Sequence, residues 1–166
     1  MGNVWKKGRG KLGVLAPLLG RWSASTESPM GPLRCTRVFE AVLGGSYVRL
    51  GTRWQLGAGP PEGQGECPDA PAKAGGGYEE IALFGAGEGG RIAFWSFTSD
   101  GKRSQGGSAD VTDLRPEAVG FEAQMLAGLA RMAYWPDGEG GFFFAVESKN
   151  KKGWKRFLEH HYRAAE

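Results

Sequence analysis

A small set of residues combines useful side-chain chemistry with a place in a predicted strand. The polar candidates for a binding site are Arg131, Glu147 and His160. An arginine can anchor an anion, while a glutamate or a histidine can act as an acid, a base or a hydrogen-bond partner. The aromatic candidates for the walls of a pocket are Trp54, Phe94 and Tyr134. Together they predict a site for a small, largely apolar molecule with a few polar anchors.

Arg131 and Glu147 fall in consecutive predicted strands and could form an internal ion pair. Buried charges are usually paired, so such a pair is either a ligand anchor or a structural feature, and both readings stay open. The other strand carboxylates show no spacing that indicates two-carboxylate chemistry. A G-x-S-x-G nucleophile motif is also absent from the sequence.

The sequence contains two histidines, His160 and His161, which are adjacent. In a strand they point to opposite faces, so they cannot both bind one metal ion. The chain has only two cysteines, Cys35 and Cys67, and they are not at the spacing of zinc ligands. We therefore expect no structural zinc site. A single inward histidine could bind a haem iron or act as an acid or base, and we expect the two cysteines to be free thiols.

The stretch from Gly85 to Gly90 matches the G-x-G-x-x-G string of dinucleotide-binding proteins. That motif works where a strand passes into a helix, whose N-terminus holds the pyrophosphate. Here the glycines lead into Arg91-Ile92-Ala93-Phe94-Trp95-Ser96-Phe97, which favours a strand. We therefore expect a hairpin loop and no nucleotide site.

Short apolar runs separated by turn residues predict an all-β fold, a single antiparallel up-and-down β-barrel of about ten strands. The expected strands are 20–27, 34–42, 46–56, 78–84, 91–98, 106–113, 118–126, 129–135, 142–149 and 154–163. A short helix within 12–19 precedes them, and Pro17 and Gly20 end it. Residues 1–11 are expected to form a basic, flexible tail to a single domain spanning 12–166. Within that domain the Gly/Pro-rich stretch 57–77 is a long loop, either a lid over the barrel mouth or a tolerated insertion.

The bulk properties exclude several classes of function. The 166-residue chain has a net charge of +3 without a concentrated basic stripe, so we expect no nucleic-acid partner. It has no apolar run of the eighteen or so residues that a membrane span needs, and we expect no membrane partner. A convincing targeting signal is missing as well, which favours a cytoplasmic protein. The sequence does not fix the oligomeric state, and a homodimer is one possibility.

The opening Gly20-Arg21-Trp22 resembles the G-x-W signature of lipocalins and their calycin relatives. In those barrels the tryptophan packs at the closed end near an arginine of the last strand, a part that Arg163 could play here. The chain is also similar to bacterial lipocalin-like and fatty-acid-binding-like barrels. It shares with them a strand ending in Gly44-Gly45 and a closing pattern of Glu147-Ser148, Trp154-Lys155-Arg156-Phe157 and Tyr162-Arg163. A weaker resemblance is to nitrobindin, a ten-stranded barrel that holds haem through a C-terminal histidine, although Ser23-Ala24-Ser25-Thr26 departs from its opening motif.

The resemblance implies a protein that holds an apolar or amphipathic small molecule in the barrel. One alternative is a haem-binding barrel with His160 or His161 as the iron ligand. A second is an enzyme, such as an isomerase, cyclase or hydratase, that uses Glu147 or His160 as acid–base. A third is a structural or assembly role with a filled barrel. We favour the binding protein.

Overall fold

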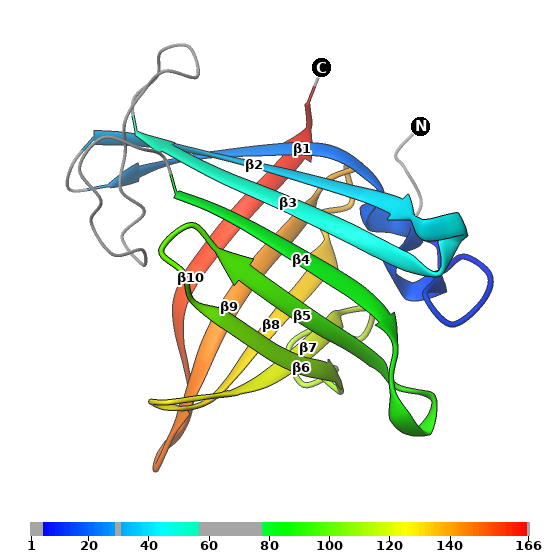
Figure 1. Ribbon diagram of the computed structural model, residues 1–166. Coiled ribbons are helices and arrows are strands. Elements are labelled where there is room, and N and C mark those ends of the chain that lie inside the picture. The colour runs from blue at the N-terminus through cyan, green and yellow to red at the C-terminus, as the bar shows by residue number, and fades with distance from the viewer. Residues whose placement is uncertain (1–4, 29–30, 57–77, 166) are drawn as a thin grey trace.

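The computed structural model describes residues 5–28, 31–56 and 78–165, which form one closed antiparallel β-barrel (Figure 1). Within these residues ten strands follow one another around the barrel in chain order, and the last pairs with the first. The strands are β1 (Gly20–Ser28), β2 (Gly31–Val42), β3 (Tyr47–Leu56), β4 (Tyr78–Ala86), β5 (Ile92–Thr98), β6 (Arg103–Ala109), β7 (Val119–Met125), β8 (Gly128–Pro136), β9 (Phe142–Asn150) and β10 (Gly153–Ala164). The predicted all-β, up-and-down barrel is confirmed.

The only helical elements in the described residues are short 3₁₀ turns: η1 (Gly13–Leu18), η2 (Leu43–Gly45) and η3 (Glu88–Gly90). The last of these lies in the β4–β5 connection, so the G-x-G-x-x-G string forms a hairpin loop as predicted. Gly89 and Gly90 there have φ of 62° and 77°, a conformation that glycine adopts without steric cost. The predicted N-terminal helix is η1, a 3₁₀ turn that ends at Leu18, so Pro17 lies within the turn and does not end it as predicted.

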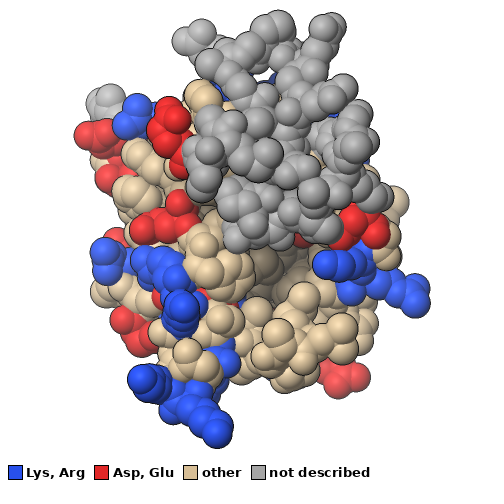
Figure 2. Space-filling model, turned by 90° about the vertical axis from the view of Figure 1, so that its left-hand side faces the viewer, with Lys and Arg blue, Asp and Glu red and all other residues tan. Residues whose placement is uncertain are grey.

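η1 covers one end of the barrel, which we call the closed end. Leu15 and Leu18 of this turn are fully buried against the interior. The indole N–H of Trp22 donates to the carbonyl of Leu18 over 2.6 Å, which fixes η1 on the first strand. Part of the segment predicted as a tail also packs here, since the side chain of Trp5 lies against the core. We call the opposite end, viewed in Figure 2, the open end.

The strand predicted at 106–113 is displaced toward the N-terminus, and β6 ends at Ala109. The carboxylate of Asp110 accepts hydrogen bonds from the backbone N–H and the hydroxyl of Thr112, which turns the chain out of the sheet. The segment that follows crosses the outer face of the barrel. Val111, 1% exposed, packs there in a second small core with Ala133 and Trp135.

The barrel closes through a short seam. β1 pairs with β2 along its whole length, but with β10 only at Trp22↔Ala164 and Ser23↔Arg163. One further backbone hydrogen bond, from Ala165 N to Arg21 O over 3.0 Å, extends the seam at the closed end. Toward the open end, β1 and β10 diverge (Figure 1).

The predicted loop at 57–77, the first four residues of the predicted tail and Cys67 lie outside the described residues. Cys35 of β2 is buried, with 1% of its surface exposed.

Candidate functional site

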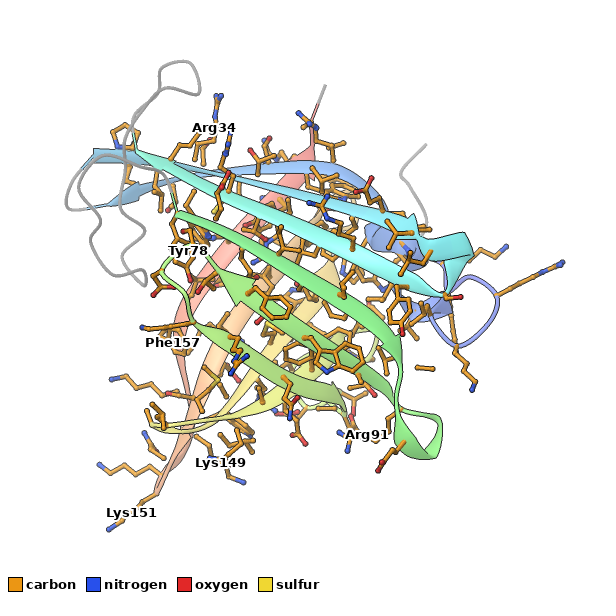
Figure 3. All side chains as sticks on the ribbon, viewed as in Figure 1. Arg34, Tyr78, Arg91, Lys149, Lys151 and Phe157 are labelled. Carbon is orange, nitrogen blue, oxygen red and sulfur yellow. The ribbon has the colours of Figure 1, made fainter. Side chains whose placement is uncertain are left out.

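The interior of the barrel holds a cavity of about 270 Å³. It extends from Phe84 and Phe94, in the middle of the barrel, to Tyr78, Met125 and Phe157 at the open end. Figure 3 labels Tyr78 and Phe157, which lie at the same end of the molecule on different strands. Met125 and Phe157 are about half exposed, so the cavity reaches solvent beside them.

Most of the cavity wall is apolar, because residues of each strand point alternately inward and outward. The inward side chains that line it are Leu50, Trp54, Tyr78, Ala82, Phe84, Phe94, Phe121, Ala123, Met125, Ala130, Met132, Phe144, Val146, Phe157 and Leu158. Its four polar residues are Arg37, Glu80, Ser96 and Ser104. The two serine hydroxyls bond to each other over 2.6 Å and so satisfy one another.

Arg37 of β2 is a buried cation in this wall, with 4% of its surface exposed. Its Nε donates to the hydroxyl of Tyr162 over 3.1 Å, and its Nη1 donates to the hydroxyl of Tyr134 over 3.0 Å. The guanidinium also lies over the ring of Phe144, with its carbon 3.9 Å from the ring centre. These contacts hold the plane of the guanidinium at a fixed orientation, and an arginine keeps its charge at any physiological pH.

Glu80 of β4 lines the same cavity as Arg37. Burial raises the pKa of the Glu80 carboxyl above its usual range, and the positive charge of Arg37 offsets part of that rise. The cavity therefore contains a permanent donor, Arg37, and a carboxyl group that changes between donor and acceptor as it titrates. A ligand with a polar end would meet both.

His160 of β10 also points inward, and 8% of it is exposed. Its ring lies against Trp54, with the ring centres 4.8 Å apart. Burial, followed by the charge of Arg37, lowers the pKa of His160 to about 4, so the imidazole is neutral at physiological pH. Its Nδ1 is buried and has no hydrogen-bond partner in the part of the chain that the structure describes.

His161, the neighbour of His160, faces outward as alternation predicts. Its Nε2 lies 2.7 Å from the carboxylate of Asp137, and its ring stacks on Phe143. The two imidazoles thus lie on opposite sides of the wall. Among the described residues, no group of three or more His, Cys, Asp and Glu could hold a metal ion.

Four of the six predicted site residues belong to the interior. Trp54 and Phe94 line the cavity directly. Tyr134 lies behind Phe144, with ring centres 4.8 Å apart, and reaches the site through its hydrogen bond to Arg37. His160 reaches it through its contact with Trp54.

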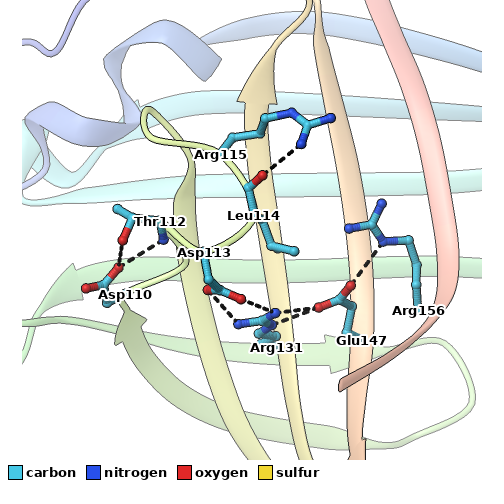
Figure 4. A network of polar contacts seen from close by, with 8 residues as sticks. All are labelled: Asp110, Thr112, Asp113, Leu114, Arg115, Arg131, Glu147 and Arg156. Carbon is cyan, nitrogen blue, oxygen red and sulfur yellow. Dashed lines mark hydrogen bonds and ion pairs between the residues drawn. The ribbon is translucent and has the colours of Figure 1, made fainter. Parts of the chain in front are cut away.

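The other two, Arg131 and Glu147, form the predicted ion pair on the outer face of the barrel (Figure 4). Arg131 lies between the cavity-lining Ala130 and Met132, so its side chain points away from the cavity. The distance from its Nη2 to Glu147 Oε1 is 2.8 Å, and both side chains are about 7% exposed. Neither side chain lines the cavity, so this arrangement does not support a ligand anchor or an acid–base inside the barrel at these two positions.

This outer pair belongs to a network that fixes the β6–β7 connection to the barrel. The guanidinium of Arg131 makes two hydrogen bonds, of 3.0 and 2.9 Å, to the carboxylate of Asp113 in that connection. Glu147 accepts a second hydrogen bond, of 3.1 Å, from Nε of Arg156. The ring of Trp154 covers Arg131 at 4.2 Å. The structural reading of the pair, left open by the sequence, accounts for all of these contacts.

Sequence reasoning missed Arg37 and Glu80. The signal was present in the alternation of β2, where Leu33, Cys35 and Phe39 point inward and Arg37 occupies the same register. An arginine in an apolar row must be buried with partners, and the two tyrosines supply them.

Among the described residues, no helix is long and apolar enough to cross a membrane. No protein-family model and no curated protein sequence matches the chain. Its structure is similar to the crystal structure of Rv2717c from M. tuberculosis, with a TM-score of 0.57 and 13% sequence identity. The match covers 95% of this chain and 99% of that chain, so the likeness extends over the whole barrel and shows the fold alone.

Proposed function

We propose that the protein binds a small amphipathic molecule inside the barrel. The observation that carries the proposal is the cavity of about 270 Å³, with apolar walls and a charged residue held in place by two tyrosines. Ligand sites are typically apolar hollows with a few fixed polar groups, and a barrel mouth is a common place for them. An apolar cavity of about 150 Å³ is large enough to hold benzene. This one accommodates a larger molecule, with a short chain or one to two rings.

The polar residues of the cavity suggest how the ligand is oriented. Its polar end is expected beside Arg37 and Glu80, and its apolar part between Phe121, Met132 and the open end. A guanidinium has five N–H donors, so Arg37 can bond an acceptor on the ligand while it keeps the two tyrosines. A ligand whose polar end accepts hydrogen bonds, such as a carboxylate or a carbonyl, fits this arrangement.

Native mass spectrometry of the purified protein, followed by calorimetric titration with medium-chain carboxylic acids and the matching alcohols, tests the proposal. Ala123→Phe places a ring in the cavity and should abolish binding, because Ala123 lines it. Gln124→Phe is the matched control, since the adjacent side chain is exposed on the other face. If the purified protein is bare and no compound of the panel binds in a way that Ala123→Phe abolishes, the proposal fails.

Glu80→Gln tests the orientation of the ligand. The substitution removes a negative charge near Arg37 and should strengthen the binding of carboxylates. The affinity for the matching alcohols should change by less than about two-fold. Equal changes for acids and alcohols would contradict a polar end beside this pair.

Haem is a second candidate, because a neutral, inward imidazole is the form that binds iron. His160 has that orientation, although its ring is packed against Trp54. A titration with haemin tests haem binding through His160. An iron ligand at this position would give a Soret shift that His160→Ala removes and His161→Ala retains. The absence of a Soret shift in the unsubstituted protein would exclude haem.

A further inference from the structure

The hairpin that joins β9 to β10, at the open end of the barrel, is strongly basic. It carries four exposed lysines, Lys149, Lys151, Lys152 and Lys155, and no acidic residue between Ser148 and Phe157. Within the described residues, none of the four makes an ion pair. The ammonium of Lys149 lies over the ring of Trp154 at 5.6 Å. Figure 3 shows Lys149 and Lys151 pointing away from the barrel, and Figure 2 shows basic side chains gathered on one side of this end.

The neighbouring β7–β8 hairpin places apolar side chains beside these lysines. Leu126, at its tip, is fully exposed, and Met125 is 45% exposed. The two hairpins are adjacent, because β8 pairs with β9 and a Cβ placed on Gly128 would lie 3.6 Å from the carbonyl oxygen of Lys149. A single exposed leucine is common on protein surfaces, so Leu126 matters here because it lies beside a cluster of lysines.

This edge is also the entrance to the cavity. Phe157, at the irregularity where β10 shifts register against β9, is half exposed and lines the cavity. Met125 shares both properties. Basic side chains, exposed apolar side chains and the opening of an apolar cavity therefore occur together on one edge.

We propose that this edge docks on an anionic lipid membrane surface, with Leu126 and Met125 entering the headgroup region and the four lysines contacting lipid phosphates and carboxylates. This inference rests on the proposed function. Docking would let an amphipathic ligand pass between the bilayer and the barrel without crossing water. A surface that rests on a bilayer is a different property from a span across it. The sequence argument against a membrane partner concerned spanning segments.

The apolar tip favours a membrane over a nucleic acid. Phosphate backbones attract lysines but offer no apolar phase in which to bury a leucine. A bilayer interface offers both, since anionic headgroups attract basic residues and the acyl boundary accepts apolar side chains. Arg156 is not counted in the docking edge because Glu147 and Glu159 neutralise it.

Sedimentation of the full chain with vesicles of equal parts phosphatidylserine and phosphatidylcholine, compared with phosphatidylcholine alone, tests the inference. Each lysine near an anionic surface contributes about five-fold in affinity. Lys151→Gln/Lys152→Gln should therefore weaken binding about 25-fold, and Leu126→Ser about ten-fold. Lys6→Gln/Lys7→Gln is the matched control, with the same change of charge in an exposed segment that precedes η1 at the closed end. The affinity of this control variant for anionic vesicles should stay within about two-fold of that of the unsubstituted protein.

Several results would overturn the inference: equal binding to neutral vesicles, no binding to anionic ones, or the same loss in the control variant. Loss of duplex DNA binding in the hairpin variants, with no competition by anionic vesicles, would assign the edge to nucleic acid instead. The vesicles carry no cavity ligand and the variants leave the cavity intact. Failure of docking is thus distinguishable from failure of ligand binding, which the Ala123→Phe titration measures.

Discussion

Acidification should destabilise the fold through His160. The imidazole is buried against Trp54, and its pKa in the folded protein is about 4, compared with an ordinary value of 6.5. Between these two values the unfolded chain takes up a proton that the folded protein excludes. The stability associated with the neutral ring is therefore fully present above pH 6.5 and is lost as the pH falls toward 4.

The size of the effect follows from the shift. Each unit of pKa difference corresponds to about 1.4 kcal/mol, so the change from 6.5 to about 4 gives an upper value of about 3 kcal/mol. Residual solvent contact of the ring screens part of this free energy, so we expect His160 to contribute about 2 kcal/mol to the pH-dependent stability. Glu80 acts in the opposite direction, because a raised carboxyl pKa favours the folded state as the pH falls. It is present in both proteins compared below and cancels in their difference.

Urea unfolding at pH 7.5, 6, 5 and 4.5, followed by tryptophan fluorescence, measures the effect. His160→Gln cannot take up the proton, so its free energy of unfolding should fall by about 2 kcal/mol less than that of the unsubstituted protein over this range. His161→Gln, the same substitution on the outward face, should keep the acid-induced loss. The reasoning is refuted if His160→Gln loses as much stability on acidification as the unsubstituted protein.

Two further predictions concern the wall of the barrel. Glu147→Gln leaves Asp113 as the one carboxylate partner of the buried Arg131 guanidinium among the described residues and should lower the free energy of unfolding by about 2 kcal/mol. Because this network is outside the barrel, affinity for the cavity ligand should not change, and a change greater than three-fold would contradict its placement. Trp22→Phe removes the donor to the carbonyl of Leu18 and should cost about 1–3 kcal/mol in the same unfolding assay. An unchanged unfolding midpoint would show that this bond does not fix η1.

The strand pattern was readable from the sequence because the barrel wall obeys a simple rule over most of its length. In β3 the alternation of Val48, Leu50 and Trp54 with exposed or half-exposed residues marks the inward face unambiguously. The glycines that join the strands were equally clear, since few other residues adopt a positive φ. Strand order then followed, because the tight turns that join most of the strands favour an antiparallel meander.

The same rule fails in β8, where both faces are covered. Ala133 and Trp135 are as deeply buried on the outside as Tyr134 is inside, because the β6–β7 connection packs over them. Alternation cannot distinguish the inner from the outer face when both rows of side chains are apolar, so the sequence could not show that Arg131 lies on the outer face. Turning the chain at Asp110 makes that covering possible, and a side-chain hydrogen bond of this kind has no periodic signature.

The short seam between β1 and β10 has a consequence for how the barrel forms. Trp22 pairs with Ala164, so closure joins residues separated by almost the whole chain, with the largest loop entropy of any pairing in the barrel. Contacts of this kind slow folding and form late, after the nine pairings between consecutive strands are in place. Because the seam has so few hydrogen bonds, we expect it to be among the places where the wall opens first in the native state and where amide hydrogens exchange soonest. A circular permutant that links the two chain ends would turn this slowest, most distant pairing into one more local hairpin.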